Sequence, residues 1–295
     1  YDPKMAANQR SGTHSGKNDD RYVFTNKDTR QEFHVAGILA ASYRVIKETY
    51  PQRAAQSLRL AKSIWTNEIG KEPKLYSSVG TPQNLVEERT NAAVELFLST
   101  GDKQYLQFIV QNKKEILNKP EETAWTVVRI LDQMPENFQT DFQNKMLEYA
   151  DYWKNKIAKN PYGVMMEEQI WGVGWGIIWQ MYKHYFLIKN MPDVFPQEHL
   201  FNAFDFVLGR HPGNNISFVS SIGNHQPIPA FGTNRADYGY IPGGVFSGSA
   251  LIAPDFIELR ENHPFVWQQN EYIVFGASGF IFLNLAALDL LASGH

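Results

Sequence analysis

Apolar side chains recur every three or four positions through most of this 295-residue chain, and short turns rich in Pro, Gly and Asn interrupt the pattern. A period near 3.6 residues predicts amphipathic helices, and we count about ten of them. The predicted helices cover residues 29–46, a segment from residue 51, and residues 81–98, 102–116, 121–131, 136–158, 169–189, 197–208 and 272–288. Segments that alternate like a strand are sparse, so the pattern predicts an all-α fold.

Several of these helices carry recognisable signals at their ends. Thr29-Arg-Gln-Glu32 has the spacing of a capping box, which makes Thr29 the expected N-cap. Pro51 suits the first position of the next helix. Thr81-Pro82 is expected to cap a third helix, and Gly101-Asp102 to end that helix and start another.

Two of the predicted helices differ from the rest because they are mostly apolar. Residues 169–189 place Trp171, Trp175 and Trp179 four positions apart, and residues 272–288 carry no charge. The second segment is slightly short for a membrane span and contains Asn284, which favours a buried core helix. Apolar helices surrounded by amphipathic ones predict an α/α toroid, with the apolar helices in its inner ring.

Composition excludes several functional classes. The net charge is −3, without the Lys/Arg-rich face of a nucleic-acid-binding protein or the basic helix of a membrane-surface protein. Zero cysteines exclude disulfides, thiolate metal sites and cysteine nucleophiles. No His-Glu-x-x-His spacing occurs, so we expect neither a metal nor a cofactor. Phe246-Ser-Gly-Ser-Ala250 resembles a nucleophile elbow only superficially, because no strand is predicted before it.

The chemistry-bearing candidate is Glu271, which stands directly before the uncharged segment 272–288. Desolvation there would raise the pKa of the carboxyl group, as a general acid at neutral pH requires. The alternative is an acid near a helix amino end, whose pKa the helix dipole would lower. The Pro- and Gly-rich segment 209–242 is too long for a simple connection and is predicted to be a functional loop. Aromatic residues make up 14% of the chain, which fits either sugar stacking or a large aromatic core.

Motifs spread over nearly the whole chain resemble those of one enzyme family. They are Asp20-Arg-Tyr22, Phe33 to Arg44, Glu88 to Asp102, Leu208-Gly-Arg-His-Pro212, Ser217-Phe-Val-Ser220 with Gly223, Pro242-Gly-Gly-Val245 and Trp267-x-x-x-Glu271. In this order they resemble the C-terminal part of glycoside hydrolase family 9. The resemblance implies an (α/α)6 barrel that cleaves β-linked, mainly β-1,4, glucans with inversion, and Glu271 as the general acid.

The chain also departs from the family pattern. The resemblance places Phe231 and Thr233 where the family has a sugar-binding His-x-Arg, and Arg235 supplies a guanidinium only through an insertion. The early Asp-x-x-Asp motif, which carries the family's general base, has no counterpart; the pair Asp19-Asp20 is a weak candidate. We therefore expect a single domain over residues 1–295 that lacks the first barrel helices and the base, and that is inactive alone if the base lies upstream.

The resemblance and the loop together give a set of candidate substrate-binding residues. They are Arg210, His225, Arg235, Asp237 and Tyr238 around the loop, with Trp267 and Trp175 as stacking rings. Each has a structural alternative. Trp175 at helical spacing is more often a core residue, Asp237 would pair with Arg235, and His225 and Arg210 would make ordinary hydrogen bonds.

The sequence thus predicts a glycoside hydrolase whose partner is an oligo- or polysaccharide, not nucleic acid or a membrane. An enzyme that acts on a polymer is expected to be periplasmic or secreted. No signal peptide is visible, so we expect that the leader is not part of this sequence. Two alternatives remain open, which are a non-hydrolytic carbohydrate-binding relative and an α/α-toroid polysaccharide lyase. The oligomeric state, the sugar and the choice between endo and exo action stay undetermined.

Overall fold

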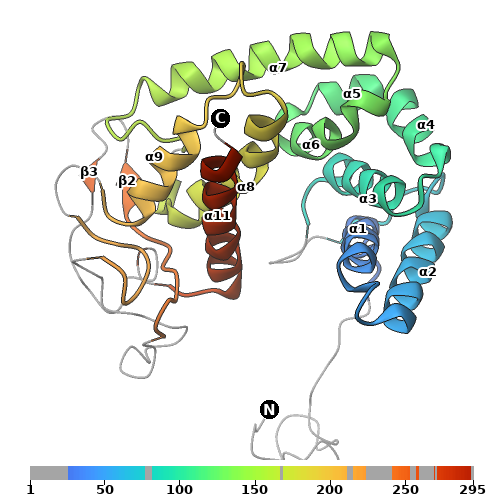
Figure 1. Cartoon of the computed structure of the whole chain (residues 1–295), viewed down its shortest axis with the longest axis horizontal. Coiled ribbons are helices and arrows are strands. Elements are labelled where there is room, and N and C mark those ends of the chain that lie inside the picture. The colour runs from blue at the N-terminus through green and yellow to red at the C-terminus, as the bar shows by residue number, and fades with distance from the viewer. Residues whose placement is uncertain are drawn as a thin grey trace, which may run out of the picture.

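The computed structural model describes residues 26–76, 82–166, 169–210, 215–223, 241–252, 257–258, 269 and 271–293. Helices dominate this part of the chain (Figure 1). They are α1 (Thr29–Ile46), α2 (Pro51–Glu68), α3 (Leu85–Thr100), α4 (Lys103–Gln111), α5 (Lys113–Leu117), α6 (Pro120–Val127), the 3-10 helix η1 (Val128–Gln133), α7 (Glu136–Ile157), α8 (Gly174–Asn190), α9 (Glu198–Val207) and α11 (Val274–Ser293). The all-α prediction is confirmed.

The helices form two layers around an open arc (Figure 1). In the inner row each helix packs on the next, α1 on α3, α3 on α6, α6 on α8 and α8 on α11. Helices α2, α4, α5, α7 and α9 lie outside that row (Figure 1). This alternation of inner and outer helices is the arrangement expected of an α/α barrel, and α1 and α11 are the two ends of the inner row.

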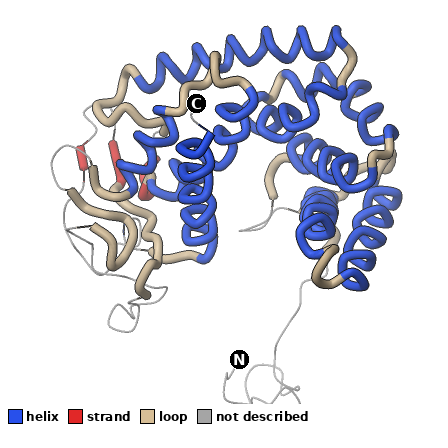
Figure 2. The backbone as a smooth tube through the Cα atoms, viewed as in Figure 1, coloured by secondary structure: helices blue, strands red, loops and turns tan. Residues whose placement is uncertain are grey.

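A small antiparallel sheet stands beside the helices, on the side of α8 and α9 (Figure 2). It has the order β1-β2-β3, with β1 (Gln169–Gly172), β2 (Ala250–Ile252) and β3 (Ile257–Glu258). Gln169 pairs with Leu251, so the sheet joins the entrance of α8 to a segment eighty residues later in the chain. Its position fixes where α8 begins.

The sheet also overturns one prediction, because the helix expected over residues 169–189 begins only at Gly174. Trp171 lies in β1, and of the three tryptophans only Trp175 and Trp179 share a helix. Tertiary packing overrides the helical pattern here. A Cβ atom on Gly172 would come within 2.4 Å of the backbone of Ser247, so the glycine permits close contact with that segment.

The predicted cap of α1 is displaced by one residue. The carboxylate of Asp28, not the Thr29 hydroxyl, accepts from the backbone N–H groups of Arg30 and Gln31, at 2.8 and 3.3 Å. The Arg30 guanidinium beside it holds the pKa of Asp28 well below its usual range. The Thr29 hydroxyl instead accepts from the backbone N–H of Lys74 at 3.0 Å. The capping-box prediction is therefore wrong about which residue caps the helix.

The other predicted helix ends agree with the structure or differ from it by a few residues. Gly101, at φ 70°, ends α3 and Asp102 caps α4, as predicted. Asn84 caps α3, while Thr81 lies outside the described residues. The helix expected over residues 102–116 is divided at Asn112 into α4 and α5. These differences move element ends without changing the order of helices.

Helix α11 is less buried than its composition predicts. Phe280, Leu283 and Leu290 are buried, and the helix contacts α8 and α9. The opposite side is exposed along Val274, Ile281, Leu285, Leu288 and Leu291. Among the described helices, α11 is long and apolar enough to cross a membrane by length and composition, although core helices pass the same test. The expectation of complete burial is wrong for this side.

Candidate active site

Glu271 lies three residues before the amino end of α11, the last helix of the inner row. Its side chain is half-buried, and this burial raises the pKa of its carboxyl group. The helix dipole, which would have lowered the pKa, acts mainly within the first turn, and α11 begins three residues later at Val274. The sequence-based expectation of a raised pKa is therefore confirmed in direction and in cause.

The backbone of Glu271 is held by a strap that we define as residues 244–249. The N–H of Ser247 donates to the carbonyl oxygen of Glu271 at 3.0 Å, and Gly248 donates to Gln269 at 2.9 Å. On its other side the strap accepts a hydrogen bond from Gly174 at 2.8 Å through the carbonyl of Ser247. The amino ends of α8 and α11 are thus bound to the same segment and lie side by side.

Close packing around the strap depends on glycine. Gly244 lies against the ring of Tyr272, where an added Cβ atom would come within 2.4 Å of Cε1. Tyr272 in turn stacks on Phe246, with ring centroids 4.5 Å apart and an interplanar angle of 26°. Because Tyr272 follows Glu271 directly, this stack helps to hold the backbone next to the glutamate.

Trp175 packs between the strap and the first turn of α11. Its indole N–H donates to the carbonyl of Val245 at 3.4 Å, and Gly276 leaves room for the ring at the start of α11. The ring remains partly exposed, so its proposed role in stacking stays a prediction.

Arg210 follows α9 and pairs with a carboxylate at the end of that helix. Its guanidinium pairs with the carboxylate of Asp205 at 2.5 Å, and its side chain is 82% exposed. This ion pair is the ordinary structural alternative that the sequence left open. The candidates His225, Arg235, Asp237, Tyr238 and Trp267 lie outside the described residues.

The serines of the strap are not available for nucleophilic chemistry. Ser247 and Ser249 are both buried, and the segment around them is held by backbone bonds to three distant parts of the chain. Residues 246–250 lead into β2 and not into a helix, so they lack the strand-to-helix turn of a nucleophile elbow. Within the described ranges no three His, Asp or Glu side chains gather into a metal site.

Aromatic side chains between α8 and α11 were not predicted as a group. Trp179 stacks on Tyr182 with centroids 4.9 Å apart, and Phe275 lies 5.2 Å from the same indole. Both Trp179 and Phe275 are more than one-third exposed. The spacing of Trp179 was visible in the sequence, but nothing in the sequence paired it with Phe275, which is four residues beyond Glu271.

Comparison with protein families gives a match over most of the chain. The family described as glycosyl hydrolase family 9 matches residues 5–264, a range that ends before Glu271. No curated protein sequence matches the chain significantly.

Solved structures similar to this chain are family 9 enzymes at low sequence identity. A metagenome-derived family 9 endoglucanase aligns with a TM-score of 0.70 and 16% identity, covering 88% of this chain and 52% of its own. AaCel9A in complex with cellobiose-like isofagomine aligns with a TM-score of 0.74 and 16% identity, covering 96% and 59%. The cellulase Cel9M of C. cellulolyticum in complex with cellobiose gives 0.70 and 17%, covering 90% and 66%.

These alignments establish the fold and its extent. The chain spans between half and two-thirds of the length of these structures, which agrees with an arc of helices rather than a closed ring. With a family match that covers residues 5–264 and the two-layered helical arc, the chain belongs to glycosyl hydrolase family 9.

Proposed function

We propose that this chain forms the larger part of the catalytic module of an inverting hydrolase of β-linked glucans, with Glu271 as the general acid. In this reaction the Glu271 carboxyl group protonates the oxygen of the scissile glycosidic bond. A water molecule attacks the anomeric carbon from the opposite face and loses its proton to a second carboxylate, which acts as the base. The bond to the leaving sugar breaks, and the new hydroxyl group has the opposite anomeric configuration.

The observation that carries this proposal is the environment of Glu271. Burial raises the pKa of its carboxyl group, so a larger fraction is protonated near neutral pH than for an exposed glutamate. The strap holds its backbone through Ser247, which favours a fixed direction for proton donation. A positioned carboxylic acid of this kind contributes about 10²–10⁴-fold to a rate.

The base is proposed to lie outside the described residues. Three carboxylates of α3 and α6 in the inner row are each engaged by a neighbour. Glu87 pairs with Lys183 at 2.9 Å, Glu88 contacts His34 at 3.0 Å, and Glu122 accepts from Asn84 at 2.9 Å. An inverting pair also needs roughly 6.5–9.5 Å between its carboxyl groups to admit the water.

The substrate class follows from the family and its neighbours. Two similar structures are complexes with cellobiose or with cellobiose-like isofagomine, which supports a β-glucan oligosaccharide as the ligand of this chain. Trp175 and the five candidates outside the described residues remain the proposed sugar-binding side chains. Action on a polymer further supports a periplasmic or secreted location.

The test uses chemical rescue, because a chain without its base is expected to be slow. Cellopentaose is incubated with the 295-residue chain, with and without sodium azide, and the product is identified by proton NMR. Azide replaces the activated water as nucleophile, so we expect faster cleavage and an α-glycosyl azide. Glu271→Gln should reduce the rate of this cleavage about 10²–10⁴-fold. The control is Glu48→Gln, at an exposed glutamate in the turn that follows α1, which should leave the rate unchanged.

Each other outcome contradicts the proposal in a recognisable way. A product with retained β configuration would exclude inversion. An unsaturated product that absorbs in the ultraviolet would identify a lyase. Binding of cellopentaose without cleavage in azide would identify the non-hydrolytic alternative.

A further inference from the structure

Helix α11 carries a regular stripe of exposed positions on the side opposite its buried residues. These positions are four and three residues apart in turn, at Val274, Ser278, Ile281, Leu285, Leu288 and Ala292. The four large aliphatic side chains among them are between 60 and 87% exposed. An average period of 3.5 residues is that of a coiled-coil seam, in which each side chain inserts between side chains of a facing helix. We define these six residues as the α11 seam.

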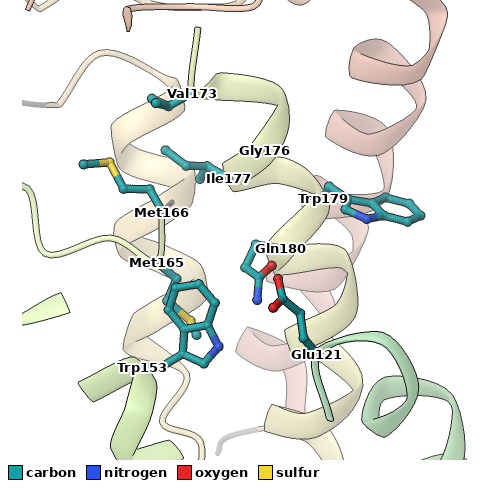
Figure 3. Close-up of a pocket in the computed structure, with 9 residues that line it drawn as sticks. All are labelled: Glu121, Trp153, Met165, Met166, Val173, Gly176, Ile177, Trp179 and Gln180. Carbon is teal, nitrogen blue, oxygen red and sulfur yellow. The ribbon is translucent and has the colours of Figure 1, made fainter. Parts of the chain in front are cut away.

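Contacts with α8 use a different side of α11. Figure 3 shows the Trp179 ring of α8 turned toward α11, where the Phe275 ring lies 5.2 Å from it. Asp289 is the one charged residue of α11, and it also reaches α8, where it pairs with Lys189 at 2.7 Å. The α11 seam therefore carries no charge and is left uncovered by α8.

The α11 seam is a continuous apolar surface. The Ser278 hydroxyl donates to the carbonyl oxygen of Phe275 at 3.0 Å, so its hydrogen is satisfied within the helix. Phe275 and Leu291 are exposed as well and border the seam. Single exposed apolar residues are normal on a soluble protein, but a contiguous apolar stripe along a helix marks an interaction surface.

The order of large and small residues along the seam is complementary to its own reverse. In an antiparallel pair of α11 helices centred at the level of Leu283, the two copies of the seam face each other in register. The facing pairs are Val274 with Ala292, Ser278 with Leu288, and Ile281 with Leu285. Each outer layer combines a small residue with a large one, and each central layer combines two aliphatic residues, which allows close packing. A two-fold axis requires this kind of self-complementary patch.

Other segments of this chain are poor candidates for covering the seam. Outside the described residues, residues 8–21 contain no large apolar side chain, and residues 224–240 and 259–268 are interrupted by proline. None of these stretches repeats the uncharged 3.5-residue period that a facing helix needs. The α11 helix of a second copy has that period by identity. A helix from a different polypeptide would need an apolar face but not the reversed order of the seam, so the register separates these two occupants.

We propose that two copies of this chain associate through the α11 seam as an antiparallel, two-fold symmetric pair of helices. α11 has 20 residues and is therefore about 30 Å long. One helix pair is a small contact compared with the roughly 800 Å² per partner of a standard interface, so the association is weak and reversible. We expect a dissociation constant of about 10 μM, so that the chain is monomeric near 1 μM and mostly dimeric near 200 μM. Unfolding measured near 1 μM then concerns the monomer.

The first test measures the mass of the 295-residue chain by sedimentation equilibrium between about 1 and 200 μM. Ile281→Glu places a charge in a central layer of the pair and should raise the dissociation constant at least about tenfold. Val45→Glu is the matched control, because Val45 is a β-branched residue of α1 that is also exposed, and it should associate as the parent does. Both variants change exposed residues, and equal melting temperatures near 1 μM would verify that both remain folded.

The second test determines the register by disulfide cross-linking, which is possible because the chain contains no cysteine. Ile281→Cys and Leu285→Cys are mixed and oxidised, and one of them carries a terminal tag so that the three linked dimers differ in mass. The antiparallel register places position 281 opposite position 285, so the mixed dimer should exceed both dimers of a single variant. A parallel pair would instead link each variant to itself.

Three results would overturn the proposal. A chain that stays monomeric at about 200 μM has no such interface, and association unchanged by Ile281→Glu would place the interface elsewhere. Linked dimers of a single variant in equal or greater yield than the mixed dimer would exclude the self-complementary register. A monomer that floats with phosphatidylcholine vesicles, and loses this binding in Ile281→Glu, would identify the seam as a membrane-binding surface instead.

Discussion

The two ends of the inner row, α1 and α11, are stabilised by different means (Figure 1). α1 packs closely on α3 through small residues such as Ala36 and Ala40, and Arg44 reaches the buried carboxylate of Glu95. α11 instead packs aromatic and aliphatic side chains, such as Phe280 on Phe204 and Phe282 on Tyr182. One end therefore combines close helix contact with buried charge, whereas the other relies on apolar area and a partly exposed ion pair between Asp289 and Lys189.

Within the described residues, the buried charge at the α1 end is paired, whereas many apolar side chains of α11 are exposed. The Glu95 carboxylate is paired with both Arg44 and Arg129, so the charge at this end is compensated. The exposed apolar side chains of α11, such as Ile281 and Leu285, contribute little burial. The two ends should therefore respond differently to substitution.

The largest effect is expected at the buried charge. Glu95→Ala leaves two guanidinium groups without their shared carboxylate, and breaking such a pair costs about 3–5 kcal/mol of the free energy of unfolding. Urea denaturation followed by circular dichroism measures this change. Glu48→Ala, at an exposed position, is the control and should stay within about 0.5 kcal/mol of the parent. A loss at Glu95 no larger than that of the control would show that charge does not hold this end.

A smaller effect is expected within α11, where two leucines two residues apart provide a matched pair. Leu283 is 1% exposed, so Leu283→Ala should cost about 2–5 kcal/mol through lost burial and the cavity it leaves. Leu285 is 60% exposed, so Leu285→Ala should change stability by about 0.5 kcal/mol or less. The same urea titration compares them. Equal losses would mean that both sides of α11 are covered in solution, contrary to the exposure found in the structure.

The sequence predicted the helices well because their signals are local. The apolar period, the Gly101 turn and the Asp102 cap each depend on residues within one or two turns. The cap of α1 was assigned to Thr29 because a capping box is a local pattern. The contacts that favour Asp28 come from Arg30 and from the backbone N–H of Tyr76, which lies far along the chain.

In the candidate site, too, features set by neighbouring residues were predictable and features set by distant segments were not. The position of Glu271 before an uncharged helix was visible in the sequence, and so was the rise in its pKa. The strap was not, because it joins segments near residues 174, 219, 246 and 271 that no local pattern connects. The contact of Trp179 with Phe275 was missed for the same reason, since it joins α8 to α11. Strand β1 was missed because its partner β2 is eighty residues away.

The smallest expected effect is a pH-dependent contribution to stability at the α1 end. The hydrogen bond to the Glu88 carboxylate raises the pKa of His34, and this contact joins α1 to α3. A histidine with a raised folded pKa stabilises fully below its unfolded pKa, about 6.5, and loses that contribution as pH rises through the folded value. Because the His34 side chain is 41% exposed, we expect about 1 kcal/mol or less.

Thermal unfolding of the parent and of His34→Gln at pH 5.5 and pH 8.5 measures this contribution. The parent should exceed the variant in melting temperature at the lower pH, and the difference should shrink at the higher pH because neutral imidazole gains little from the carboxylate. The half-buried His199 has the opposite tendency, since burial lowers its pKa, but it is present in both proteins and cancels from the difference. A difference independent of pH would show that His34 acts through packing alone. The contact of α1 with α3 at His34 would then depend on contact area, and the charge at this end would act through Glu95 alone.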